Sequence, residues 1–313
     1  MFLKVKDEFK VIGGDANSVM KRLNTGVYKV SKRNEGFSFS IYLTPMETRN
    51  QNTMLKNGVF GEINEHLEVF FDPHMVTARK QLNSINKFAC LIYGEQGSGK
   101  THHAILWAQK IAQERDAISL VIDNAAQYDL SSLVESLRDN DPDRFVVLVL
   151  EEFEKTFHNF KDPDLLSFLD GANAKDNLII LATCNDVSKI PDVLLDRPGR
   201  FEKKFKLAAG NKDVMRGMIK VLIPTEYEGR IDTERIIDML QSHNKWTIDY
   251  IRILLRNEIA ELLFFDEHGH MRHYPDLFSN NELILASNSS APAGSSCEDT
   301  FSRGLIDHLF WND

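Results

Sequence analysis

Between residues 87 and 185 the chain alternates short, almost wholly apolar runs with stretches of helical character. The apolar runs are FACLIYG, AISLVID, RFVVLVLEE and NLIILATCN, and the helical stretches between them cover residues 101–113, 130–137 and 163–172. Strands this apolar are typical of a parallel sheet that is covered by helices on both faces. The alternation therefore predicts an α/β fold built on a parallel sheet.

The first apolar run leads into GEQGSGKT at residues 94–101, which fits the G-x-x-x-x-G-K-[ST] pattern of a phosphate-binding loop. Glycines let backbone N–H groups close around phosphate oxygens, assisted by the positive end of the following helix. We expect Lys100 to reach the β- and γ-phosphates of ATP and Thr101 to place its hydroxyl on Mg²⁺. The predicted nucleotide contacts are Gly94, Glu95, Gln96, Gly97, Ser98, Gly99, Lys100, Thr101 and His102, with helix packing as the alternative role of His102.

Polar side chains end two further apolar runs. Glu151 and Glu152 follow VVLVL, and carboxylates at a strand end beside a phosphate loop can serve Mg²⁺ and the attacking water respectively. Glu151 is the predicted metal-side residue, although an Asp is more usual there, and Glu152 is the predicted base. Asn185 follows LIILATC, where its amide could orient the water near the γ-phosphate. Solvated carboxylates and a local Asn turn are the structural alternatives.

A fourth motif, LLDRPGRFEKKF, contains two arginines in one turn. Arg197 and Arg200 flank Pro198 and Gly199, and we expect this turn to hold both guanidinium groups near the surface. An arginine supplied by a neighbouring subunit can neutralise charge in the transition state of phosphoryl transfer. Surface ion pairing is the alternative role for both side chains.

Taken in order, GEQGSGKT, LEEFEK, ATCND and LLDRPGRFEKK resemble the AAA branch of the AAA+ ATPases, over about residues 67–264. The resemblance implies that residues 94–101 are Walker A, that Glu151 and Glu152 belong to Walker B, and that Asn185 is sensor 1. It further implies that Arg197 and Arg200 are arginine fingers acting on the nucleotide of the neighbouring subunit. Lys100 is a predicted catalytic residue of its own subunit's site. Such proteins form rings, usually hexamers.

Within that branch, SLVIDNAAQYDLSSLVESL, VVLVLEEFEKTF and LLSFLDGANAKDNLIILATCN resemble the mitochondrial translocase that exports a folded iron–sulfur protein. That family has an N-terminal membrane helix, and no apolar run here reaches the roughly 18 residues that such a helix needs. We therefore do not expect this chain to share the membrane-translocation activity of that family. The protein-threading motors of this branch have a pore loop in which an aromatic residue is followed by glycine. Tyr128 is the aromatic residue in the corresponding region, but no glycine follows it. Tyr128 is therefore either a pore-loop residue or a packing residue.

The same patterns divide the chain into four segments. Residues 1–58 form a β-rich N-terminal domain, in which TGVYKVSKRNEGFSFSIYL predicts a hairpin around residues 33–36. The resemblance implies that residues 59–208 form the large ATPase domain and that residues 209–286 form an all-helical lid. Residues 287–313 are a low-complexity linker and an apolar tip, LIDHLFWND, which could dock on a partner or on its own chain.

Charge and cysteine content limit the classes of partner and compartment. The net charge of −9 argues against general nucleic-acid or anionic-membrane binding. The three cysteines, Cys90, Cys184 and Cys297, are far apart, which favours a reducing, cytoplasmic location. His268, His270 and His273 cluster in DEHGHMRHY, where a metal site competes with a turn at the end of a helix.

We therefore expect a ring-forming AAA ATPase that binds ATP and Mg²⁺ and remodels, disassembles or translocates a protein client. One rival is a nucleic-acid-associated ATPase of the loader or transposition type, which would need a basic stripe; the basic runs MKRL, SKRN and EKKFK are short. The other rival is a scaffold protein whose assembly is controlled by ATP.

Overall fold

The computed structural model describes residues 1–12, 20–36, 38–49, 58–139, 141–157, 163–170, 176–195, 199–207, 212–243 and 247–264 of the 313-residue chain. It divides into two compact units. The first comprises Met1–Val221 with Trp246–Ile248, and the second comprises Leu222–Lys245 with Asp249–Asp313. Each unit is described separately.

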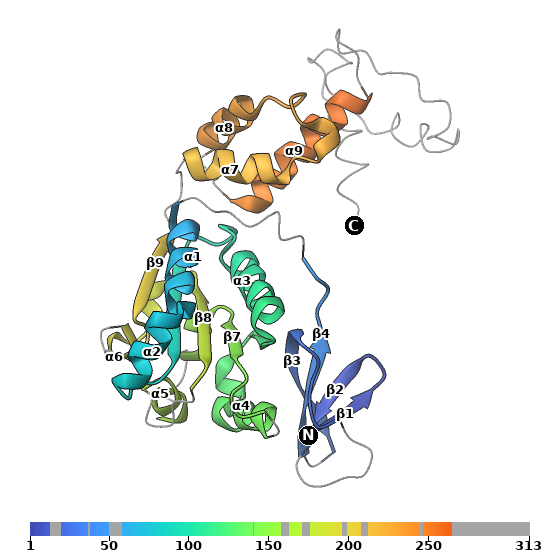
Figure 1. Ribbon diagram of the computed structural model, residues 1–313. Helices are drawn as coiled ribbons and strands as arrows, with labels where there is room; N and C mark the ends of the chain where they lie inside the picture. The colour runs from blue at the N-terminus through green and yellow to red at the C-terminus, as the bar shows by residue number, and fades with distance from the viewer. Residues whose placement is uncertain are drawn as a thin grey trace. The chain divides into compact units, whose positions relative to one another are not determined.

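The first unit is built on a nine-stranded sheet with the order β1-β2-β4-β3-β6-β7-β8-β5-β9 (Figure 1). Strands β6, β7, β8, β5 and β9 run parallel to their neighbours, and β3 also runs parallel to β6. The strands are β1 (Phe2–Val5), β2 (Glu8–Val11), β3 (Gly26–Glu35), β4 (Ser38–Pro45), β5 (Lys87–Gly94), β6 (Ile118–Ile122), β7 (Val146–Leu150), β8 (Leu178–Cys184) and β9 (Lys203–Leu207). The predicted α/β class with a parallel sheet is confirmed.

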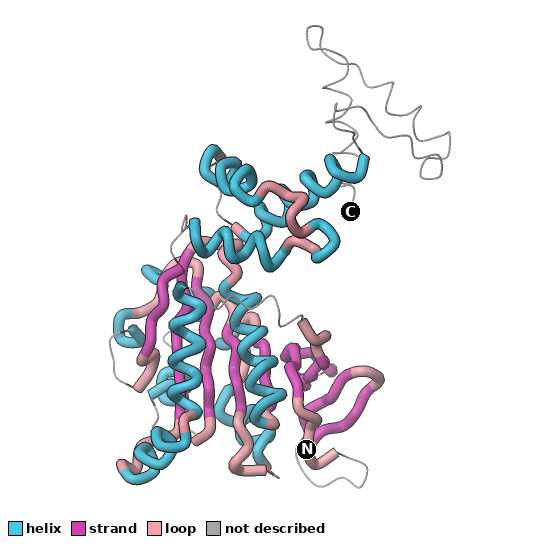
Figure 2. The backbone as a smooth tube through the Cα atoms, turned by 45° about the horizontal axis from the view of Figure 1, so that its top comes forward, coloured by secondary structure: helices cyan, strands magenta, loops and turns pink. Residues whose placement is uncertain are grey.

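Burial explains why the central strands are so apolar. Every residue of β6, β7 and β8 is buried, because helices cover both faces of the sheet (Figure 2). One face packs against α4 (Leu130–Arg138) and α5 (Pro163–Asp170), and α3 (Lys100–Arg115) lies against β6, β7 and β8 on the other. The remaining helices of this unit are α1 (Gly58–Phe71), α2 (Pro73–Gln81), α6 (Asp192–Leu195), α7 (Lys212–Leu222) and the short 3-10 turns η2 (Ala125–Gln127), η3 (Phe153–Phe157) and η4 (Val187–Lys189).

The N-terminal strands extend this same sheet. The predicted hairpin is confirmed, since β3 and β4 pair antiparallel and close at Glu35 opposite Ser38. The first half of β3 also pairs with β6, from Gly26 opposite Ile118 to Lys29 opposite Val121. Beyond Lys29 the hairpin continues past the last paired residue of β6. The boundary at residue 58 remains a prediction, but the strands before it are hydrogen-bonded to the parallel sheet.

The second unit is helical in the part that the structure describes, as predicted. It contains η5 (Thr225–Tyr227), α8 (Thr233–Ser242) and most of α9 (Ile248–Phe264). Asp232 caps α8 by accepting hydrogen bonds from the N–H groups of Glu234 and Arg235. Ile236, Ile237 and Leu240 are buried along one stripe of the helix.

None of the helices within the described ranges combines the length and the apolar character required to cross a bilayer. Several sequence-based hypotheses concern residues outside those ranges. These are the histidine cluster at His268, His270 and His273, the C-terminal LIDHLFWND segment, and the role of Arg197.

Candidate functional site

The predicted site residues meet at one edge of the parallel sheet. The order β7-β8-β5 makes these three strands neighbours, and parallel strands end at the same edge. The phosphate loop follows β5, Glu151 and Glu152 follow β7, and Asn185 follows β8. The topology therefore brings together three motifs that are far apart in the sequence, since Gly94 and Asn185 are separated by ninety-one positions.

The phosphate loop has the backbone that its glycines permit. Gly94, Gly97 and Gly99 have φ values of 151°, 76° and 87°, a region that favours glycine. A Cβ atom added at Gly94 would lie 2.4 Å from the carbonyl oxygen of Leu207, so this position has no room for a side chain. Gly99 occupies the N-cap position of α3, which begins at Lys100. The loop therefore leads directly into a helix N-terminus, where anions are favoured.

Lys100 lies inside the curve of this loop. Its ammonium group donates hydrogen bonds to the carbonyl oxygens of Gly94 (2.9 Å) and Glu95 (2.7 Å) and to Ser98 Oγ (3.3 Å). The side chain is only 5% exposed, and burial is the main cause that lowers its pKa. A buried ammonium that is held by loop atoms marks the centre of an anion cradle.

Thr101 faces the ends of the neighbouring strands. Its hydroxyl oxygen lies 3.4 Å from the hydroxyl oxygen of Thr183, which is buried near the end of β8. Thr183 Oγ1 also accepts a hydrogen bond from the backbone N–H of Glu152 at 3.3 Å. Thr183 thus links all three motifs, and sequence reasoning missed it. The available signal was a lone hydroxyl within the apolar run LIILATC.

Glu152 is held in an unusual backbone conformation. Its φ of 45° is in the left-handed region, which costs a non-glycine residue on the order of 1 kcal/mol or more and is often found at functional sites. Glu152 Oε1 accepts a hydrogen bond from Asn185 Nδ2 at 3.3 Å, and its other oxygen pairs with Lys155. Two residues that we predicted separately as base and water-orienting amide are therefore in direct contact.

Glu154 holds the backbone of Asn185 in place. Its carboxylate is buried and accepts a hydrogen bond from the backbone N–H of Asn185 at 2.9 Å. Sequence reasoning missed this role, because a carboxylate four residues after a strand cannot be distinguished from a solvated one without the fold. The contact ties the turn after β7 to the end of β8.

Glu151 lies beside a second carboxyl group. It shares a hydrogen bond with Asp123, which follows β6. Burial, followed by the hydrogen bond and charge of Asp123, raises the pKa of Glu151 to about 7. The hydroxyl of Thr101 and the carboxyl of Glu151 are hard oxygen donors of the kind that Mg²⁺ prefers, so the donor set fits this ion. The described residues contain no cluster of three or more His, Cys, Asp or Glu side chains arranged to hold a metal.

The arginine turn differs from our expectation. The Arg200 side chain is only 2% exposed, and its guanidinium donates a hydrogen bond to the carbonyl oxygen of Val193 at 2.6 Å. The prediction that both guanidinium groups lie near the surface is therefore wrong for Arg200. The turn folds this side chain inward, where it satisfies a carbonyl group of the short helix α6. Arg197 lies outside the described residues.

This burial predicts an effect of Arg200→Ala on stability. The variant loses a hydrogen bond donated by a charged group that is itself buried, so we expect a loss of about 1–3 kcal/mol. Thermal unfolding of the nucleotide-free protein measures it, with Lys203→Ala, an exposed cation of β9, as the matched control. An unchanged Tm for Arg200→Ala would contradict a structural contribution of this side chain.

Two histidines follow Thr101 and have different surroundings. His102 Nδ1 lies 2.9 Å from the guanidinium of Arg49, so this predicted nucleotide contact is engaged with the N-terminal segment. His103 is buried and stacks on Phe60 with 3.8 Å between the ring centroids. Burial lowers the pKa of His103 to about 4, although its hydrogen bond to the Gly99 carbonyl acts in the opposite direction.

The low pKa of His103 predicts a pH-dependent loss of stability. An unfolded histidine titrates near 6.5, so between about pH 6.5 and pH 4 the unfolded chain binds a proton that the folded chain does not. The stability contribution is complete above this window and falls by about 2 kcal/mol between pH 6.5 and pH 5. Denaturant unfolding at both pH values should show a smaller decrease for His103→Leu, and His74→Leu should retain the wild-type decrease.

Tyr128 packs against the sheet. It follows η2, is partly buried against the core, and its hydroxyl lies 3.5 Å from the carbonyl oxygen of Val30 in β3. These contacts are those of the packing residue that we weighed against a pore-loop residue.

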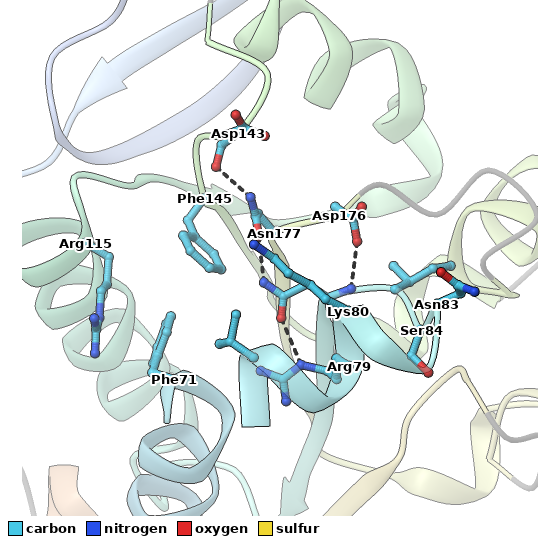
Figure 3. Close-up of a pocket in the computed structure, with 13 residues that line it drawn as sticks. Phe71, Arg79, Lys80, Asn83, Ser84, Arg115, Asp143, Phe145, Asp176 and Asn177 are labelled. Atoms are coloured by element: carbon cyan, nitrogen blue, oxygen red, sulfur yellow. Dashed lines mark hydrogen bonds between the residues drawn. The ribbon is translucent and has the colours of Figure 1, made fainter. Parts of the chain in front are cut away.

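A pocket of about 690 Å³ lies at the other edge of the sheet (Figure 3). Its lining includes residues 83–86, 143, 145 and 176–177, which precede β5, β7 and β8 respectively. Along its wall Arg79 donates to Asn86, Asn86 to Asn177, and Asn177 to the carbonyl of Asp143. Because the nucleotide motifs follow these strands, the pocket is not part of the predicted site.

Residues 90–209 match the model of the ATPase family associated with various cellular activities (AAA). The matched segment contains the phosphate loop, both glutamates, Asn185 and the arginine turn. No curated protein matches the chain. The match supports an ATPase of the AAA type with a nucleotide-binding P-loop.

Proposed function

We propose that the chain hydrolyses ATP at this edge of the sheet and does so as one subunit of a ring. The observation that carries the proposal is the contact network that joins Thr101 of the loop to Glu152 and Asn185 through Thr183. A turn rich in glycine has no need of such a network, whereas phosphoryl transfer requires a phosphate cradle and a positioned water side by side.

Binding is assigned to the loop. Lys100 would exchange its bonds to loop carbonyls for the β- and γ-phosphate oxygens, and backbone N–H groups of residues 95–101 would hold the remaining oxygens. Thr101 and Glu151 are the proposed holders of Mg²⁺, with Glu151 acting through a water molecule because its side chain is longer than that of Asp. When bound, Mg²⁺ would neutralise negative charge on the phosphates of ATP.

Hydrolysis is assigned to Glu152 and Asn185. A water molecule attacks the γ-phosphorus, its oxygen forms the new P–O bond, and the bond from the γ-phosphorus to the β–γ bridging oxygen breaks. Glu152 accepts the proton of the water, and the amide of Asn185 orients both the water and the carboxylate. Glu154 acts through Asn185 as a positioning residue.

The remaining charge neutralisation is assigned to a neighbouring subunit. Arg197, or Arg200 after release from its buried contact, would approach the γ-phosphate of the next copy, which requires a ring and by family resemblance a hexamer. A protein client in the cytoplasm would then be remodelled, disassembled or translocated. This part of the proposal rests on the family resemblance and on the AAA match.

Mixing two inactive variants tests the shared site. Glu152→Gln retains its arginines but lacks the base, and Arg197→Ala retains the base but lacks one predicted finger. If the sites are shared between subunits, mixed assemblies contain some complete sites, so the mixture should hydrolyse ATP faster than either variant alone. A mixture that forms assemblies yet stays as inactive as its components would contradict the shared site. Nucleotide-dependent assembly without turnover would support the scaffold alternative.

A further inference from the structure

The pocket at the edge of the sheet opposite the phosphate loop has two aromatic side chains in its lining, Phe71 and Phe145. Phe71 ends α1 and Phe145 immediately precedes β7, and their ring centroids lie 5.4 Å apart in an edge-to-face arrangement. The guanidinium of Arg115, the last residue of α3, lies over the ring of Phe71 at 4.6 Å. Figure 3 shows these three side chains together on one side of the pocket, which therefore presents flat apolar surface next to a cation.

Another part of the lining is fixed by hydrogen bonds between side-chain amides. Arg79 Nε donates to Asn86 Oδ1 at 3.0 Å, and Asn86 Nδ2 donates to Asn177 Oδ1 at 2.6 Å. Asn177 Nδ2 donates in turn to the carbonyl oxygen of Asp143 at 2.6 Å. These bonds join α2 to the residues that precede β5, β7 and β8, so this wall is already organised for binding.

The charge that the lining leaves unmatched is positive. The charged residues of the pocket are Arg79, Lys80, Arg115, Asp143 and Asp176. The carboxylates of Asp143 and Asp176 interact electrostatically with the buried guanidinium of Arg138, which lies outside the lining. Within the described ranges, Lys80 and Arg115 take part in no ion pair. Both cations are therefore available to a negatively charged ligand.

The dimensions of the pocket favour an organic ligand over a single ion. Its volume of about 690 Å³ falls within the range of about 300–1,000 Å³ that is typical of small-molecule sites. A guanidinium stacks on aromatic faces, and one that covers a phenylalanine on one side can stack a ligand ring on the other. Solvated surface cations are the alternative, but solvation alone does not explain the paired aromatic rings or the bonded amide wall.

We propose that this pocket is a second binding site, which takes a small aromatic anion. The anionic group binds Lys80 and Arg115 through charge-assisted hydrogen bonds, and the ring packs against Phe71 and Phe145. The inference goes beyond the proposed function and does not depend on it. The phosphate loop follows β5, whereas the pocket is lined by residues that precede this strand.

Calorimetric titration of the full-length protein with naphthalene-2-sulfonate, a flat aromatic anion, tests the proposal. We expect one molecule to bind per chain, and we expect Arg115→Met and Lys80→Met each to weaken binding by about tenfold or more, as for the loss of hydrogen bonds from a charged donor. Both side chains are exposed, so the variants should retain the wild-type Tm. Lys110→Met is the matched control, since Lys110 lies on the same helix as Arg115 but outside the pocket.

Two further ligands and one further variant separate this site from its alternatives. Neutral 2-naphthol and inorganic sulfate should each bind at least about tenfold more weakly than the sulfonate, because each lacks one of the two groups that the pocket recognises. Lys100→Met should bind the sulfonate as the wild type does. Absent binding by the wild type, equal binding by Arg115→Met and Lys80→Met, or binding that Lys100→Met abolishes would each overturn the inference and leave the proposed ATP hydrolysis untouched.

Discussion

Replacing Glu152 with Gln should lower the turnover of ATP by about 10²–10⁴-fold while leaving ATP binding nearly unchanged. The amide retains the size of the carboxylate and its contact with Asn185 Nδ2 can rearrange, but it cannot accept the proton of the attacking water. Because the side chain of Glu152 bonds to Asn185 and Lys155 and not to the phosphate loop, ATP binding should be little affected. Steady-state phosphate release and equilibrium ATP binding measure the two effects separately.

The matched control is Glu114→Gln, an exposed carboxylate near the end of α3. It should retain wild-type turnover. Unchanged turnover in Glu152→Gln would remove this residue from the mechanism, and equal losses of binding and turnover would indicate a collapsed site.

Replacing Lys100 with Met should weaken ATP binding by about 10- to 100-fold, as expected for the loss of hydrogen bonds from a charged donor to phosphate. Burial already lowers the pKa of the Lys100 ammonium, so its removal relieves a desolvation cost in the nucleotide-free protein. That relief opposes the loss of the three hydrogen bonds from Lys100 to the loop, so the variant should bind ATP poorly while its thermal stability changes little. Calorimetric titration and thermal unfolding measure the two quantities.

Lys110→Met provides the control on the same helix. Lys110 Nζ donates a hydrogen bond to Asn64 Oδ1 of α1 at 3.4 Å, away from the phosphate loop. It should bind ATP as the wild type does. Retained ATP affinity in Lys100→Met would contradict the assignment of residues 94–101 as the cradle.

The parallel sheet could be predicted because its signals are local. Runs such as VVLVL and LIILATC are apolar at every position, and this pattern has few other stable solutions in a chain of this length. The hairpin closing near Gly36 was equally readable from its alternation and turn residues.

The joining of this hairpin to the parallel sheet could not be predicted. Pairing of β3 with β6 connects residues about ninety positions apart, and its register depends on the edge that β6 offers rather than on any local pattern. The ion pair between Lys29 and Asp123 follows from the same pairing and was likewise missed.

At the site, the residue types were predictable and their partners were not. Glu152 and Asn185 were identified by position after strands, yet the contact between them depends on strand order. Thr183 and Glu154 act through buried hydrogen bonds to backbone N–H groups, which leave no spacing signal. The exposure of Arg200 was predicted wrongly because a turn with proline and glycine is exposed on average. Here the guanidinium is buried and donates a hydrogen bond to the carbonyl of Val193.

Phosphate release from ATP by the purified full-length protein, with Mg²⁺ and with EDTA, tests the central claim most directly. The account predicts Mg²⁺-dependent release that Glu152→Gln and Lys100→Met each suppress, the first with ATP still bound and the second without it. ATP binding with no Mg²⁺-dependent release by the wild type would contradict hydrolysis at this site.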